Sequence, residues 1–255
     1  MSFDVILTRR MEAFSVATEA NDYLELTAKM TAIPATILKI LKVTPPASLP
    51  PPIEGINFNS EHIVLILLDN FGLFEYTYYK PEFLIQACDA LVLLDTDNPY
   101  TDSVLKQVFY VTEQFSGFHL PSILIENGKS VAMVGRQEEL NIIAHNEYSI
   151  SSTDDMNVYI NAVKALNRHD FLSLHFIDFE KLYQQYAFQP PAETLKQLIR
   201  RTDKWLKVLF MQAKPGSVFI VLSSHGKHQI DLQIKGKAAQ WRLASLPIAI
   251  FSKKP

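Results

Sequence analysis

Short, continuous apolar runs recur along most of the chain and alternate with stretches of helical periodicity. The runs lack the strict apolar–polar alternation of a half-exposed strand, which is typical of parallel strands covered by helices on both faces. Alternating strands and helices of this kind predict an α/β fold, with a mostly parallel sheet sandwiched between helices. The expected strands are Ile63–Leu68, Ala90–Leu94, Val131–Val134, Phe171–Ile177, Val218–Leu222 and Pro247–Phe251.

Two of the intervening helices carry their own start signals. Thr153, Asp154 and Asp155 offer an N-cap before a helix over Met156–Leu166, because their side-chain oxygens can accept the first free backbone N–H groups. Pro191 is placed to open a long helix, since the first helical turn tolerates a proline. Its apolar side would comprise Leu195, Leu198, Ile199, Leu206, Leu209 and Phe210.

The first part of the chain follows a different pattern. Apolar residues there recur at spacings of mostly three and four, as on one face of a helix, and Pro34 predicts a break or kink. A run of prolines then favours an extended connector over regular structure. We therefore expect a helical N-terminal extension over residues 1–43, a proline-rich connector over 44–60 and an α/β domain over 61–255.

The composition fits one large domain and excludes several kinds of partner. Of the 255 residues, 48% are hydrophobic and 20% charged, which suits a sizeable core. The formal net charge of −3 gives no basic field for nucleic acid or an anionic membrane. The single cysteine, Cys88, excludes an internal disulfide and, from its apolar surroundings, is expected to be a buried structural thiol.

The sequence also predicts where the protein resides. The N-terminus lacks the basic-then-apolar pattern of a signal peptide. The longest apolar run, Ile63–Leu68, is far shorter than the roughly 18 residues that a membrane helix needs. We therefore expect a cytoplasmic protein without a membrane partner.

Polar residues follow four of the expected strands. Asp69 follows the first strand, Thr101 opens a helix after the second, Asp178 and Glu180 follow the fourth, and His225 follows the fifth. Ligands of open parallel sheets bind beyond the carboxyl ends of the strands. Carboxylates and imidazoles converging there would suit a divalent metal. Residues of these types are also common in ordinary turns, so the pattern alone leaves both interpretations open.

A resemblance to a known family makes the pattern more specific. The segment 175–186 resembles the one that carries Asp-x-x-Gly-His in the alkaline phosphatase superfamily, within its nucleotide pyrophosphatase/phosphodiesterase branch. Ser223-Ser224-His225-Gly226 stands where that branch has Ser-Asp-His-Gly. Ile63–Gly72 is similar to the family's opening strand, and Gly128–Gly135 to its Gly-x-x-x-x-x-x-Gly strand. The resemblance begins near Glu61 and implies an alkaline-phosphatase-like α/β domain.

The resemblance implies phosphoryl transfer assisted by two metal ions, usually zinc. Asp69 matches the first-strand metal ligand, and His225 matches the histidine of Ser-Asp-His-Gly. Thr101 is the candidate nucleophile, at a helix start where the helix dipole favours an anion. Asp178 and Glu180 complete the set of candidate metal ligands.

Three ligand positions of the family carry other residues, and one change keeps a carboxylate, because Glu180 falls on the aspartate of Asp-x-x-Gly-His. Ser224 replaces the aspartate of Ser-Asp-His-Gly, and Gln184 falls on the histidine of Asp-x-x-Gly-His. Serine and glutamine replace carboxylate and imidazole poorly, so we expect one tightly bound divalent metal (zinc or manganese) or none.

Two functions follow from these departures. The first is a degenerate superfamily member that acts as a binding or scaffolding protein. The alternative is an active metal-dependent phosphatase or phosphodiesterase with a non-standard ligand set. The expected partner is a phosphate-containing small molecule or another protein, and the sequence leaves the substrate and the oligomeric state open.

Overall fold

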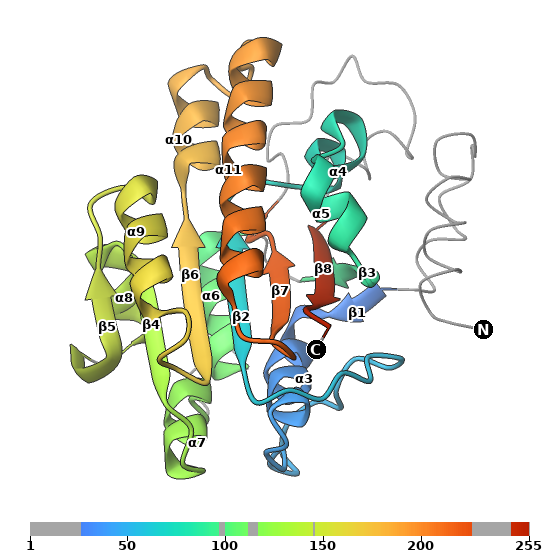
Figure 1. The fold of residues 1–255 in the computed structure, drawn as a ribbon, viewed down its shortest axis with the longest axis vertical. Helices are drawn as coiled ribbons and strands as arrows, with labels where there is room; N and C mark the ends of the chain where they lie inside the picture. The colour runs from blue at the N-terminus through green and yellow to red at the C-terminus, as the bar shows by residue number, and fades with distance from the viewer. Residues whose placement is uncertain (1–26, 97–99, 112–116, 145, 226–245, 255) are drawn as a thin grey trace.

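The structure of the chain is a computed structural model, which describes residues 27–96, 100–111, 117–144, 146–225 and 246–254. Within them an eight-stranded sheet has the order β1-β3-β8-β7-β2-β6-β4-β5 (Figure 1). The strands are β1 Thr27–Lys29, β2 Ile63–Leu68, β3 Ala90–Asp95, β4 Val131–Gly135, β5 Ser149–Ser151, β6 Phe171–Phe176, β7 Val218–Leu222 and β8 Leu246–Ser252.

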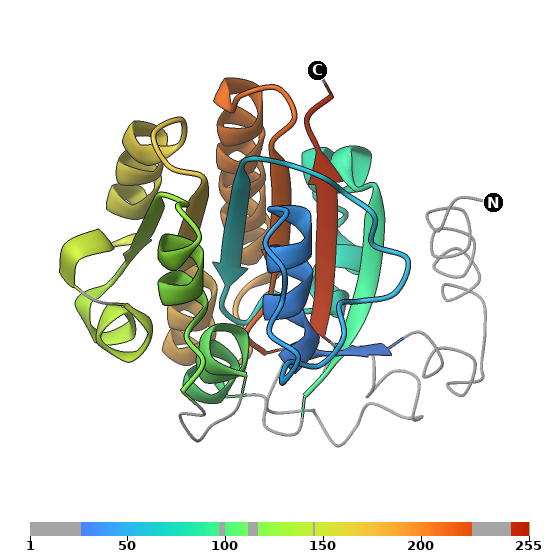
Figure 2. The same cartoon turned by 90° about the horizontal axis from the view of Figure 1, so that it is seen from below.

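Helices cover both faces of the sheet, which confirms the α/β class. Helices α9, α10 and α11 lie on one face, and α3 and α6 lie on the other (Figures 1 and 2). Among the described helices, none has both the length and the apolar character needed to cross a bilayer. The helices are α3 Ile33–Ile40, α4 Leu73–Tyr79, α5 Glu82–Ala87, α6 Thr101–Tyr110, α7 Leu120–Glu126, α8 Gln137–Ile143, α9 Asp155–Ala165, α10 Asp178–Gln185 and α11 Ala192–Gln212, with short 3-10 turns η1 Met30–Ala32 and η2 Asn146–Tyr148.

All the expected strands are present, but one of them runs the other way. Strand β8 pairs antiparallel with both β3 and β7, whereas the other pairings in the sheet are parallel. A central strand buried on both faces is apolar throughout whichever way it runs, so the run at Pro247–Phe251 could not reveal its direction. The sequence also gave no sign of β1 and β5, which have three residues each.

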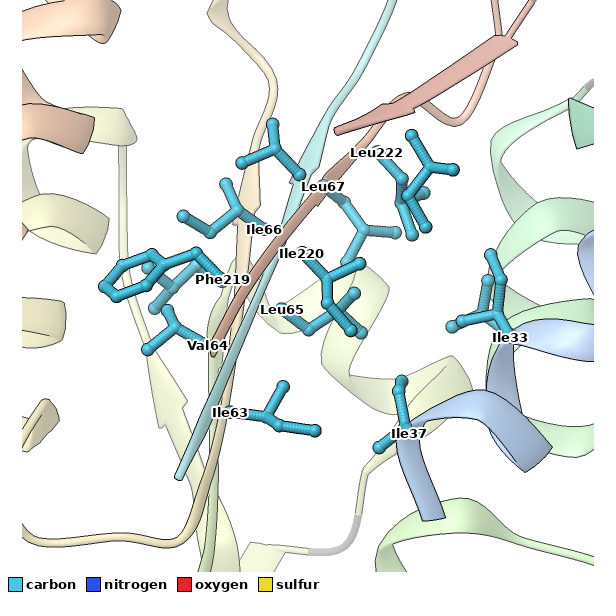
Figure 3. Packing of buried hydrophobic residues seen from close by; sticks show 14 of the residues in the cluster. Ile33, Ile37, Ile63, Val64, Leu65, Ile66, Leu67, Phe219, Ile220 and Leu222 are labelled. Carbon is cyan, nitrogen blue, oxygen red and sulfur yellow. The ribbon is translucent and has the colours of Figure 1, made fainter. Parts of the chain in front are cut away.

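The described part of the N-terminal segment belongs to the main core. Thr27–Lys29 is a strand paired with β3, so the expected helix is wrong there, and residues 1–26 lie outside the described residues. Pro34 lies in the first turn of α3, which begins at Ile33, and does not break a helix, because a backbone N–H in the first turn has no partner within the helix. Ile33 and Ile37 of α3 are buried in the same hydrophobic cluster as the central strands (Figure 3). The division into three segments stays a prediction.

The alternation of side chains along the central strands decides which residues meet at the sheet edge. Leu65 and Leu67 point towards α3, whereas Val64 and Ile66 point to the opposite face (Figure 3). Leu67 is in register with His175 of β6 and with Leu222 of β7. Asp69 and Ser224 each come two residues after one of these leucines, so their side chains lie on the same side of the sheet as His175 and close to it.

We predict that Ile37→Ala lowers the free energy of unfolding of the whole domain by about 2–5 kcal/mol, because it leaves a cavity under the sheet. Ile37 is 0% exposed. The matched control is Ile125→Ala on α7, where the side chain is 46% exposed and the change should stay within about 0.5 kcal/mol. Urea denaturation followed by far-UV circular dichroism measures both. A separate early transition in the Ile37 variant, with the main one unmoved, would contradict a shared core.

Candidate functional site

The carboxyl ends of β2, β6 and β7 and the start of α6 bring four polar side chains together. Asp69 follows β2 and is 3% exposed. Its Oδ1 accepts a hydrogen bond from the Ser224 hydroxyl and lies 2.9 Å from Nε2 of His175. Its Oδ2 accepts a hydrogen bond of 3.4 Å from the Thr101 hydroxyl. We call Asp69, Thr101, His175 and Ser224 the Asp69 cluster, in which both carboxylate oxygens are engaged.

Asp69 and His175 form a buried ion pair. Burial alone would raise the pKa of Asp69, but the charge of His175 and the hydroxyl of Ser224 outweigh it, so the pKa is lowered. Burial would lower the pKa of His175, but the charge of Asp69 outweighs it and the pKa is raised. Nε2 of His175 lies 2.9 Å from Oδ1 of Asp69, so both the charge of Asp69 and a hydrogen bond to it favour the protonated imidazole.

A second group of polar side chains adjoins the first. Oε2 of Glu180 accepts a hydrogen bond of 3.0 Å from Asn70, and Oε1 accepts one of 2.6 Å from Gln184. Nε2 of His225 lies 3.7 Å from Oε2 of Glu180. Asn70 has a left-handed backbone (φ 57°), a conformation that asparagine adopts more readily than most residues. We call Asn70, Glu180, Gln184 and His225 the Glu180 cluster.

Asp178 does not join either cluster. Its Oδ2 accepts a hydrogen bond of 2.8 Å from Arg201 of α11, and its backbone N–H donates to the buried carboxyl of Asp155. Burial, with a contribution from the charge of Asp178, raises the pKa of Asp155 to about 6. Residues two apart on a helix face different directions, so Asp178 and Glu180 cannot both face the sheet edge. The structure thus brings Asp69, Thr101, Glu180 and His225 to one edge and turns Asp178 towards α11.

Sequence reasoning gave His175 no role, although it lies at the centre of the Asp69 cluster. A weak signal existed, because His175 stands in an otherwise largely apolar strand. Its meaning depends on the register of Leu67 with His175, and hence on β6 lying beside β2. Strand order across parallel βα units is a long-range property that the apolar runs do not encode.

The donors at this edge do not fit a zinc ion. Among the described residues, no group of three or more His, Cys, Asp or Glu side chains is arranged to hold a metal. Asp69 and Glu180 each use both carboxylate oxygens in contacts with neighbouring side chains. Tetrahedral zinc sites need about four free donors. The expectation of one divalent metal or none stays a prediction.

Comparison with known proteins identifies the fold. No protein-family model matches the chain, and no curated protein matches it. Among solved structures, the chain is similar to the C-terminal periplasmic domain of EptC from Escherichia coli in complex with Zn (TM-score 0.52, 14% identity, 76% of this chain and 73% of that one). It is also similar to a 2-O GAG sulfatase (TM-score 0.57, 9% identity, 76% and 64%).

A third similar structure carries the superfamily in its description. It is a protein in the alkaline phosphatase superfamily from Vibrio parahaemolyticus, with a TM-score of 0.50, 11% identity, and coverage of 76% of this chain and 60% of that one. The chain therefore has the alkaline-phosphatase-like fold, as its resemblance in sequence implied. Identities this low establish the fold and leave the chemistry to the residues at the sheet edge.

The ion pair predicts a specific dependence of stability on pH. Asp69 has a lowered pKa, so its contribution is complete above the ordinary value of 3.8 and is lost as the pH falls through the folded value. His175 has a raised pKa, so its contribution is complete below 6.5 and is lost as the pH rises through its folded value. The pair therefore stabilises the fold most between these two ordinary values.

We expect the difference in unfolding free energy between the wild type and His175→Gln to shrink as the pH rises, by up to about 1.4 kcal/mol per pH unit. Urea titrations at several pH values above 6.5 measure it. Asp69→Asn should remove the same alkaline slope, because it removes the charge that raises the pKa of His175. A difference that stays constant with pH would mean that His175 is neutral in the folded protein.

Proposed function

We propose that this chain is a degenerate relative of the alkaline phosphatase superfamily that acts as a binding or scaffolding protein and does not hydrolyse phosphate esters. The observation that carries the proposal is the contact between Ser224 and Asp69. In the resemblance, Ser224 stands at the position of a metal-binding aspartate. In this structure the Ser224 hydroxyl donates a hydrogen bond to Asp69, so the residue at this position binds Asp69 and offers no carboxylate to a metal.

The surroundings of Thr101 support the same proposal. A threonine nucleophile needs a base or a metal to remove its proton. The carboxylate within reach belongs to Asp69, whose lowered pKa makes it a weak base. Both oxygens of Asp69 are already in contact with described side chains, so the charge of a phosphoryl-transfer transition state would lack the metal stabilisation on which such enzymes depend.

Another protein is the partner that we favour over a phosphate-containing small molecule. The exposed carboxyl-end surface includes Tyr78 on α4, 62% exposed, and Tyr100 before α6, 64% exposed. Tyrosine is enriched in protein interfaces. The two clusters, as the described residues form them, contain no lysine or arginine to pair with a phosphate. We keep the cytoplasm as the proposed location, which cell fractionation would test.

We expect no hydrolysis of 4-nitrophenyl phosphate or bis(4-nitrophenyl) phosphate above background, with or without added zinc or manganese. Losing metal stabilisation costs several kcal/mol, which is orders of magnitude in rate. Release of 4-nitrophenolate measures the activity.

The controls are Asp69→Ala and Thr101→Ala, prepared in the same way as the wild type. Wild-type turnover that disappears in both variants would establish the alternative, an active metal-dependent hydrolase with a non-standard ligand set. Turnover that persists in both would come from a contaminant.

A further inference from the structure

We infer that His175 and Ser224 together take over the two tasks that a metal ion would perform at Asp69. One task is to neutralise a buried carboxylate, and the other is to join the ends of neighbouring strands. The edge of the sheet is then a closed, metal-free structural centre. This inference rests on the proposed function and states what replaced the metal.

The first task requires a positive charge beside Asp69. Burying an unpaired carboxylate costs several kcal/mol. Nε2 of His175 faces Oδ1 of Asp69 at 2.9 Å and His175 is itself 3% exposed, so the imidazole is the basic group in position to neutralise the carboxylate. The register of β2 with β6 places His175 on the side towards which Asp69 extends. Among the described residues, the charge of Glu139 also favours the cationic form of His175 and the charge of Arg136 opposes it.

The space for His175 is part of the fold. Gly135 ends the neighbouring strand β4, and a Cβ built on it would lie 3.4 Å from Cβ of His175 and 3.8 Å from Cγ of Leu140. A Cβ there would meet both neighbours at ordinary van der Waals distances, so His175 packs closely against this end of β4.

The second task, joining strand ends, falls to the serines after β7. Ser224 binds Asp69 after β2. Ser223 accepts a hydrogen bond of 3.2 Å from the N–H of Phe71 and donates one of 2.6 Å to the carbonyl oxygen of His225. These bonds tie the β7 end to the β2 end. The ion pair ties the β6 end to the same carboxylate, and Thr101 adds α6.

The test measures zinc content and thermal stability on the full chain. We expect the purified wild type to hold well under one zinc per chain, and its melting temperature to change little with zinc chloride or EDTA. We expect His175→Gln and Ser224→Ala each to lower the melting temperature, by about 5 °C or more for the histidine.

Two variants separate this role from a general effect of mutation. Ser130→Ala removes a similar serine–carboxylate bond, 2.9 Å long but exposed to solvent, and should shift the melting temperature by only about 2 °C or less. Ser224→Thr keeps the hydroxyl and should recover much of what Ser224→Ala loses. A Ser224→Ala loss no larger than the Ser130→Ala loss would contradict the inference.

The converse experiment opens the centre to metal. The double variant His175→Ala with Ser224→Asp frees one face of Asp69 and adds a second carboxylate beside it. We expect a zinc-dependent rise in its melting temperature, since a ligand that binds only the folded state stabilises it. If the double variant folds and shows no such rise, His175 and Ser224 are not what excludes the metal.

One result overturns the inference outright, whatever the variants do. This would be stoichiometric zinc in the wild type that raises the melting temperature and is lost in Asp69→Asn. Such a protein could still fail to hydrolyse phosphate esters, so the proposed function would survive. Conversely, hydrolysis of phosphate esters by metal-free wild type would contradict the proposed function, and the inference of a metal-free centre would still hold.

Discussion

The fold depends on the need to neutralise one carboxylate buried at the end of its central strand. Asp69 lies where β2, β6 and β7 finish together, with almost no contact with water. A charge there must find a partner inside the protein, because the solvent cannot supply one. His175, Ser224 and Thr101 all converge on it from different elements.

The start of α10 shows how a secondary structure element limits what a site can contain. Asp155 accepts the N–H groups of Ile177 and Asp178, and Arg201 holds the side chain of Asp178 from α11. These hydrogen bonds fix the direction in which α10 leaves the sheet. Glu180 is then the acidic residue of its first turn that reaches Asn70 at the strand ends. The carboxylate of Glu180 therefore lies at the sheet edge, whereas that of Asp178 packs against α11.

The sequence predicted the positions of the strands and helices better than the order and direction in which the strands pair. Apolar runs located the central strands, and the side chain of Asp154 caps α9 as expected by accepting the N–H of Asn157. These are local effects of burial and hydrogen bonding within a few residues. The direction of β8 and the place of His175 depend on which strands become neighbours, which local patterns do not encode. Asp178 was expected at the sheet edge with Glu180, whereas at the start of α10 its side chain binds Arg201 of α11.

The antiparallel course of β8 has a practical consequence for handling the protein. Its last residues return to the sheet edge opposite Asp69, where Nζ of Lys253 donates a 2.7 Å hydrogen bond to the carbonyl oxygen of Met211 near the end of α11. Seven residues of strand span roughly 20 Å. A surface-coupling handle placed after Lys254 would therefore orient immobilised molecules with the carboxyl-end edge of the sheet facing away from the support.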